Sequence, residues 1–229
     1  MDTVNAELDI ANPITKELDT FRTTLLLNLI QAVSANTKLG YKKIPFFEIG
    51  KVFNENREEF TKVAFVFSGQ KSSENIYNNG KPANITFFEF ADKVANVIGN
   101  FDLKNSGTNN QFFHPYQNSE IFKNGQKIGV LAKLHPSVAS DFDIDDTFVC
   151  EIDFEKLSTA NICASFISKF QSLRRDLSIL VPKDMEFEQI TRKISSLNIN
   201  ELKNFNLVDV YFDEKLGDFE SLTLRFTLQ

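Results

Sequence analysis

Two histidines are the first residues in this 229-residue chain that could do chemistry. His114 and His135 each stand directly before a proline, and a turn around Asn124-Gly125 lies between them. Asn-Gly supplies the positive backbone angles of a tight reversal, and apolar runs flank it, so the region predicts a β-hairpin. Two histidines in one hairpin region could bind a metal, but no third ligand has suitable spacing. We therefore favour histidines that end strands over a metal site.

A second candidate is the acidic run Asp141, Asp143 and Asp145, which imitates the start of an EF-hand calcium loop. The sixth position of such a loop would be Asp146 instead of glycine, and the twelfth would be Ile152 instead of glutamate. The chain also has no glycine-rich phosphate loop and no nucleophile elbow. The sequence therefore predicts neither a bound metal nor these kinds of active site.

Composition narrows the class of protein. With 42% hydrophobic residues the chain can bury a core, and no apolar run is long enough to span a membrane. The net charge of −6 gives no general attraction to nucleic acid, so we expect no DNA partner and only a local RNA contact. Cys150 and Cys163 have no metal-binding spacing, and two free thiols favour a reducing cytoplasm.

The first two thirds of the chain predict a mixture of helices and antiparallel strands. Apolar periodicity and turn residues set the expected bounds. The predicted helices are Thr23–Lys38, Phe87–Gly99 and a short one at Pro136–Phe142. The predicted strands are Leu8–Ala11, Pro45–Phe53, Lys62–Gly69, Ser119–Phe122, Ile128–Leu131 and Phe148–Phe154.

The last third predicts a separate β-α-β-β unit. The small and polar stretch Ser158–Ser168 has the composition of a linker. After it come the predicted strand Leu177–Val181, an amphipathic helix Glu186–Leu197, and the strands Leu207–Phe212 and Ser221–Leu228.

Several short segments together carry a family resemblance. They are Asn12-Pro13 with Phe21–Leu26, Phe47–Phe53, His114-Pro115 with Ser119–Ile121, Leu134–Pro136, and Arg174–Ser178 with Asp209–Tyr211. In this order and spacing they resemble the beta subunits of bacterial phenylalanyl-tRNA synthetase, over nearly the whole chain. No single motif among them is specific.

The resemblance implies an α+β chain of two domains. Residues 1–160 would form a non-catalytic, antiparallel sheet domain like that of class II aminoacyl-tRNA synthetases. Residues 166–229 would form a ferredoxin-like (RRM-like) anticodon-binding domain, truncated after its third strand. Because such subunits carry further domains before this region, we expect the chain to be a fragment, whether a truncated gene or an incomplete record.

The resemblance also implies degenerate catalytic positions. Asn54 stands where the catalytic relative has an arginine for the ATP α-phosphate, and Glu151 and Asp153 replace glycines beneath the nucleotide. Lys156 replaces a second arginine and lacks its planar fork. Two carboxylates there would fill the site and repel polyphosphate. We therefore expect this chain alone not to form an adenylate.

An RNA-binding face is expected on the last unit. Strand alternation predicts that Leu177, Val208, Val210, Phe212 and Leu224 point inward. The side chains predicted to face solvent include those that could stack on a base or donate to a phosphate. These candidate RNA-binding residues are Arg174, Arg175, Ser178, Tyr211, Thr223 and Arg225. An alternative is that Arg175 and Asp176 form a structural ion pair at the strand entry.

The leading hypothesis is thus a non-catalytic part of phenylalanine–tRNA ligase that supports the alpha subunit and helps to bind the anticodon of tRNA(Phe). By resemblance, the parent complex would be an (alpha-beta)2 tetramer using ATP and Mg²⁺, with no cofactor held by these residues. The alternative is a free-standing RNA- or protein-binding paralogue without aminoacylation activity.

Overall fold

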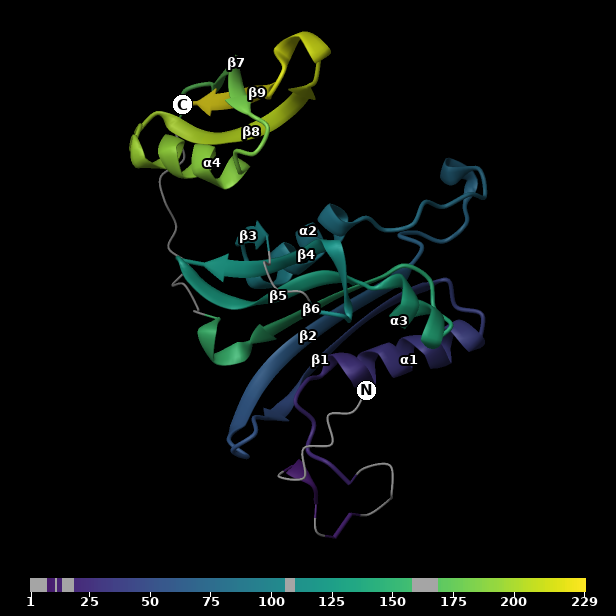
Figure 1. Ribbon diagram of the computed structural model, residues 1–229. Helices are drawn as coiled ribbons and strands as arrows, with labels where there is room; N and C mark the ends of the chain where they lie inside the picture. Colours follow the sequence, from purple (N-terminus) through teal and green to yellow (C-terminus); the bar gives the residue numbers. More distant parts are fainter. Residues whose placement is uncertain (1–7, 11, 14–18, 106–109, 158–168) are drawn as a thin grey trace. The chain divides into compact units, whose positions relative to one another are not determined.

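The computed structural model describes residues 8–10, 12–13, 19–105, 110–157 and 169–229 (Figure 1). The chain forms two compact units, Met1–Thr159 and Ala160–Gln229. The predicted linker Ser158–Ser168, and Cys163 within it, lie outside the described residues.

An antiparallel sheet of six strands organises the first unit, in the order β1-β2-β6-β5-β4-β3. The sequence-predicted hairpin pairs β1 with β2 along their full length without a register shift. The strands are β1 (Lys43–Phe53), β2 (Glu59–Gly69), β3 (Asp102–Asn105), β4 (Phe113–Lys123), β5 (Gln126–Leu134) and β6 (Thr147–Asp153). Every neighbouring pair is antiparallel, as expected for this fold class.

Helices bury both faces of this sheet. The apolar stripe of α1 (Leu26–Lys38) packs on one face, where Val66 and Val149 are buried. The stripe of α2 (Phe87–Ile98) packs on the other, where Phe148 and Ile152 are buried. Strand β6 is therefore covered on both sides, which explains why its residues alternate between two apolar cores instead of between core and water.

Local capping sets where these helices begin and end. Gly40 has a φ of 87° just past the end of α1, as the glycine there predicted. Helix α2 begins in a capping box between Thr86 and Glu89. Hydrogen bonds from Lys71 and Thr86 lower the pKa of Glu89 to about 2, so the box keeps its charge at ordinary pH.

The hairpin around Asn124-Gly125 is confirmed. Both residues have positive φ, 52° and 78°, and they join β4 to β5. A short helix α3 (Pro136–Asp141) leads from β5 toward β6. Strand β6 ends at Asp153, and a 3-10 turn, η3 (Phe154–Lys156), follows it. The predicted strand at Leu8–Ala11 is wrong: Asp9 makes only an isolated bridge with Thr20, and Ala11 lies outside the described residues.

The second unit is a three-stranded antiparallel sheet, in the order β7-β9-β8, with one helix among its described residues. The elements are β7 (Leu173–Pro182), α4 (Phe187–Ser196), β8 (Leu202–Tyr211) and β9 (Phe219–Leu228). A 3-10 turn, η4 (Glu214–Leu216), lies between β8 and β9, and another in the first unit is η2 (Ile76–Asn78). A small core forms where α4 meets the sheet, made of Val181, Ile190, Leu222 and Leu224.

Four residues predicted to point inward are exposed, while Leu224 is buried as expected. The predicted direction holds for Leu177 and Val210, which pair with Leu224 and Leu222 on the helix side, but their predicted burial is wrong. Leu177, Val208, Val210 and Phe212 are 53%, 43%, 36% and 62% exposed. A register shift between Leu207 and Asp209 puts an extra residue in β8, so simple alternation fails there. Leu177 does face the helix side, because it pairs with Leu224, but the α4 core does not include it.

No helix within the described ranges is long and apolar enough to cross a membrane.

Candidate functional site

The structure brings together three of the four positions that were predicted to be degenerate. Glu151, Asp153 and Lys156 line one pocket of about 240 Å³. Its other lining residues are Lys62, Lys127, Gly129 and Val130. Gly129 permits the close approach of the two strands here, because a Cβ at this position would lie 2.2 Å from the carbonyl oxygen of Glu151.

Glu151 is buried and fully engaged by neighbours that are distant in the sequence. Its Oε1 accepts hydrogen bonds from the Leu25 backbone N–H and the Thr24 hydroxyl, both at 2.7 Å. Its Oε2 pairs with the Lys62 ammonium at 2.9 Å. The carboxylate thus satisfies a backbone donor where the chain enters α1, and it anchors that helix to the middle of the sheet.

Asp153 and Lys156 form an ion pair with each other, with a distance of 2.6 Å between Oδ2 and Nζ, and both side chains are partly exposed to solvent. Asn54 is not a lining residue of the pocket. It sits in the β1–β2 turn, where its Oδ1 accepts from the backbone N–H groups of Asn56 and Glu58. All three side chains therefore have structural partners.

These residues do not fit ATP and Mg²⁺. A nucleotide polyphosphate needs donors and cations, yet the pocket places two carboxylates among its lysines, and two of these lysines are already paired with Glu151 and Asp153. A magnesium ion needs free carboxylate oxygens, but both oxygens of Glu151 are committed.

The histidines act as local caps. His135 Nδ1 accepts from the Ser137 backbone N–H at the start of α3, and His114 Nδ1 accepts from the Tyr116 backbone N–H. No group of three or more His, Cys, Asp or Glu side chains that could hold a metal occurs among the described residues.

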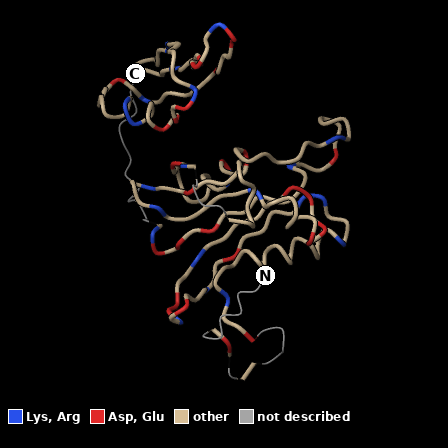
Figure 2. Tube along the Cα trace, viewed as in Figure 1, with Lys and Arg blue, Asp and Glu red and all other residues tan. Residues whose placement is uncertain are grey.

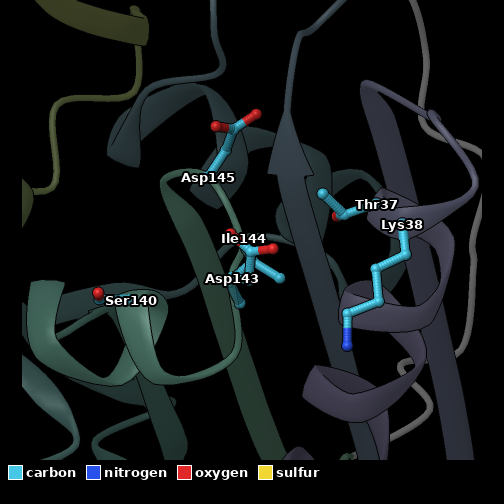
Figure 3. Close-up of a pocket in the computed structure, with 6 residues that line it drawn as sticks. All are labelled: Thr37, Lys38, Ser140, Asp143, Ile144 and Asp145. Atoms are coloured by element: carbon cyan, nitrogen blue, oxygen red, sulfur yellow. The ribbon is translucent and has the colours of Figure 1, made fainter.

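The acidic run forms part of a different, polar pocket. Asp143 and Asp145 line it from the loop between α3 and β6, and Thr37 and Lys38 line it from the end of α1 (Figure 3). Asp141 is not among its lining residues. The aspartates of the run therefore do not converge on one point as an EF-hand loop requires.

The second unit presents a polar face opposite α4. Paired residues of antiparallel strands point to the same side, so the pairing defines this face. Arg225 pairs with Asp176 and Asn206, and Thr223 pairs with Ser178 and Asp209. The polar residues of the open face, so defined, are Arg174, Asp176, Ser178, Asn204, Asn206, Asp209, Tyr211, Ser221, Thr223, Arg225 and Thr227. At one end of the face the same pairing adds Leu180, Pro182 and Phe219.

An ion pair occupies the middle of the open face. The Arg225 guanidinium donates to both oxygens of Asp176 at 2.8 Å, in a bidentate pair between neighbouring strands. The hydrogen bonds from Arg225 lower the pKa of Asp176, and the same contact raises the pKa of Arg225. The structural ion pair considered at this strand therefore exists, but the partner of Asp176 is Arg225 and not Arg175.

The remaining predicted contacts divide between the two faces. Arg174 lies on the open face opposite Thr227, whereas Arg175 pairs with Phe226 and lies on the helix side. Ser178 and Thr223 are joined through their hydroxyls at 2.9 Å. Tyr211 is 53% exposed, and its hydroxyl donates to Asp213, which raises the pKa of the phenol. Arg175 is thus the one predicted contact that the open face does not include.

Acidic and basic residues are interspersed along both units (Figure 2). On the open face Arg174 and Arg225 are matched by Asp176 and Asp209. The face therefore offers hydroxyls, amides, the aromatic ring of Tyr211 and balanced charge, which suits the recognition of unstacked bases better than that of a phosphate-rich duplex.

Two family comparisons match the chain in sequence order. The family described as phenylalanyl tRNA synthetase beta chain CLM domain matches residues 1–154, and the ferredoxin-fold anticodon binding domain matches residues 168–229. The chain belongs to the phenylalanyl-tRNA synthetase beta chain family. The fold class predicted from the resemblance is confirmed with it.

Curated relatives carry the same name. The phenylalanine–tRNA ligase beta subunits of Sulfurimonas denitrificans, Campylobacter jejuni strain RM1221 and Wolinella succinogenes are 43%, 40% and 42% identical, over 96%, 98% and 99% of this chain. The chain spans 28% to 29% of the length of these relatives. Among solved structures, the chain is similar to a crystal structure of pyrrolysyl-tRNA synthetase from Desulfitobacterium hafniense. The match covers 66% of this chain and 52% of the synthetase chain, with 17% sequence identity and a TM-score of 0.46.

Sequence reasoning missed several participants. Thr24 and Lys62 hold Glu151 but lie 127 and 89 residues away from it. Asn204 and Asn206 extend the open face, because β8 begins five residues before the predicted start. The alternation of polar and apolar residues from Asn204 to Leu207 was a usable signal for this extension.

Proposed function

We propose that this chain is the part of a phenylalanine–tRNA ligase beta subunit that supports the catalytic alpha subunit and binds the anticodon of tRNA(Phe). The observation that carries the proposal is the sequential match of the two beta-subunit families to residues 1–154 and 168–229. The parent enzyme would be a cytoplasmic (alpha-beta)2 complex that uses ATP and Mg²⁺ on the alpha subunit.

The first unit supports a scaffolding role. Its pocket around Glu151 does not fit a nucleotide, and the carboxylate there serves to hold α1 on the sheet. Because both carboxylate oxygens of Glu151 bond to the protein itself, this side chain stabilises the fold. The chain is therefore expected to show no phenylalanine-dependent ATP–pyrophosphate exchange by itself.

The second unit supports the RNA role. Exposed Tyr211 offers a ring for stacking, and Arg174 offers a guanidinium on the same open face. Arg225 is bound by Asp176, so it contributes little net charge and acts mainly to order the face. Arg174 is consequently the better candidate for a phosphate or base contact.

Adjacent arginines on opposite faces give a matched test. Arg174→Ala and Arg175→Ala remove the same charge from neighbouring positions of β7, but only Arg174 lies on the open face. In the assembled ligase, Arg174→Ala is expected to weaken tRNA(Phe) binding by about 1–3 kcal/mol, and Arg175→Ala by clearly less. Filter binding at two salt concentrations measures both.

Equal losses for the two variants would show that the open face does not bind the tRNA. Tyr211→Ala provides an independent arm, because the loss of a stacked ring weakens binding with little dependence on salt.

A further inference from the structure

The outer edge of β1 is unusual for a sheet margin. Strand β1 is eleven residues long, lies at one end of the six-stranded sheet, and pairs with β2 without a bulge (Figure 1). Edge strands of soluble proteins are commonly short, bulged or charged, because their free backbone groups pair with other chains. The opposite margin follows that rule, since β3 has four residues and includes Asp102 and Lys104.

Hydrogen bonding identifies the residues of β1 that face outward. The Phe53 N–H donates to the Arg22 carbonyl, and the Lys51 carbonyl accepts from Arg22 Nε, so these two residues point their backbone away from β2. In an antiparallel ladder the direction alternates, so Pro45, Phe47 and Ile49 face outward as well. Within the described part of the chain, no residue bonds to the backbone of Phe47 or Ile49 on that side.

The same residues expose apolar side chains. Phe47 is 68% exposed and Ile49 is 54% exposed, and the Phe47 ring lies 6.4 Å from that of Phe65 on the neighbouring strand. Open backbone groups and alternate apolar side chains thus coincide on one stretch of strand. This is the arrangement by which a sheet accepts an additional strand: backbone bonds give affinity, and the side chains give specificity.

We propose that the outer edge of β1 pairs with an extended strand of the alpha subunit, which lays apolar side chains against Phe47 and Ile49. The inference rests on the proposed function, which makes the alpha subunit the partner. Only a polypeptide offers donors and acceptors at the spacing of Phe47 and Ile49, so neither RNA nor a lipid surface fits this edge.

Charge favours a partner strand over a second copy of this chain. A two-fold register that pairs all residues from Lys43 to Lys51 is centred on Phe47. It sets Pro45 of each copy opposite Ile49 of the other, and a proline has no N–H to donate to the Ile49 carbonyl. It also sets Lys43 opposite Lys51, whose ammonium is already paired with Glu59 of its own chain at 2.9 Å. Like charges directly opposite each other destabilise a strand pair. A partner strand with apolar residues at its centre and carboxylates at its ends complements the edge instead.

A proline substitution distinguishes a partner that pairs with the backbone of β1 from one that only packs on its side chains. Ile49→Pro removes an outward N–H that the fold of the chain does not use, and the native Pro45 at another outward position shows that a proline is tolerated there. Ile49→Val keeps that N–H and the branched side chain, so it is the matched control. Phe47→Ser leaves the backbone intact and removes the ring, and it serves as a second variant if Ile49→Pro does not fold.

The association of the chain with purified alpha subunit is measured by sedimentation or calorimetry, with circular dichroism as the check on folding. We expect Ile49→Pro and Phe47→Ser each to weaken association by about tenfold or more, and Ile49→Val to resemble the wild type. Association that neither Ile49→Pro nor Phe47→Ser weakens overturns the inference and leaves the proposed function standing.

Two other results have distinct meanings. A wild-type chain that does not bind the alpha subunit contradicts the proposed partner itself. A chain that dimerises alone through Phe47, and loses the dimer in Phe47→Ser, assigns the edge to a second copy and overturns the alpha subunit as its occupant.

Discussion

The two units of this chain place their ion pairs in different environments. In the first unit, Lys62 and Glu151 form an ion pair in which the Glu151 side chain is only 9% exposed, between a sheet and the start of a helix. In the second unit, Asp176 and Arg225 pair on an open sheet face, with side chains 44% and 43% exposed. The first pair satisfies a buried carboxylate inside the fold, whereas the second orders side chains on a surface.

Coverage of the sheets explains this difference. The first sheet has a helix on each face, so a carboxylate within it must be bonded on all sides. The second sheet has a small core under α4 and leaves its other face polar. The number of sheet faces that helices cover therefore decides whether a charged pair is enclosed or lies on an accessible surface.

The largest expected effect is at Glu151. Glu151→Ala leaves the half-buried Lys62 ammonium without its partner and removes the acceptor for the buried Leu25 N–H, so the first unit should lose about 3 kcal/mol of unfolding free energy. Asp153→Ala, which removes an exposed pair with Lys156 from the same pocket, should cost no more than about 1 kcal/mol. Urea unfolding of the whole chain measures both. Similar losses would mean that burial does not distinguish these two carboxylates.

A second contrast lies within the second unit. Leu224→Ala should destabilise that unit by about 2–5 kcal/mol, because Leu224 is 1% exposed in the α4 core. Leu177 pairs with Leu224 on the same side of the sheet but is 53% exposed, so Leu177→Ala should cost less than about 1 kcal/mol. Hydrogen exchange of the β9 amides reports on this unit in the intact chain. If Leu177→Ala costs as much as Leu224→Ala, then a partner covers Leu177 in solution.

The smallest effect concerns pH. Because the Arg225 guanidinium lowers the pKa of Asp176 in the folded state, the unfolded chain binds the proton more readily. The stabilising contribution is therefore complete above the ordinary pKa of an aspartate, and it is lost as the pH falls through the lower folded value. Between about pH 5 and pH 2, the wild type should lose slightly more stability in the second unit than Asp176→Asn does. Parallel pH profiles of the two proteins would contradict this.

Predictions that depended on neighbouring residues succeeded. The Asn124-Gly125 turn, the glycine that follows α1 and the apolar stripe of α2 are encoded within a few residues, because turn angles and helical periodicity are local properties. Strand ends were less predictable. Arg174, Arg175 and Asp176 look like a polar loop, yet they belong to β7 because β9 supplies their hydrogen-bond partners.

The sequence by itself determined the family and the α+β order of elements, since these depend on residue types and their order. It also predicted degenerate catalytic positions at Asn54, Glu151, Asp153 and Lys156. The tertiary structure decided what those residues do. Glu151 bonds to Thr24, Leu25 and Lys62, and the Arg225 guanidinium pairs with Asp176. Such partners are brought together by strand pairing and burial, which follow from the free energy of the whole sheet and not from any local segment.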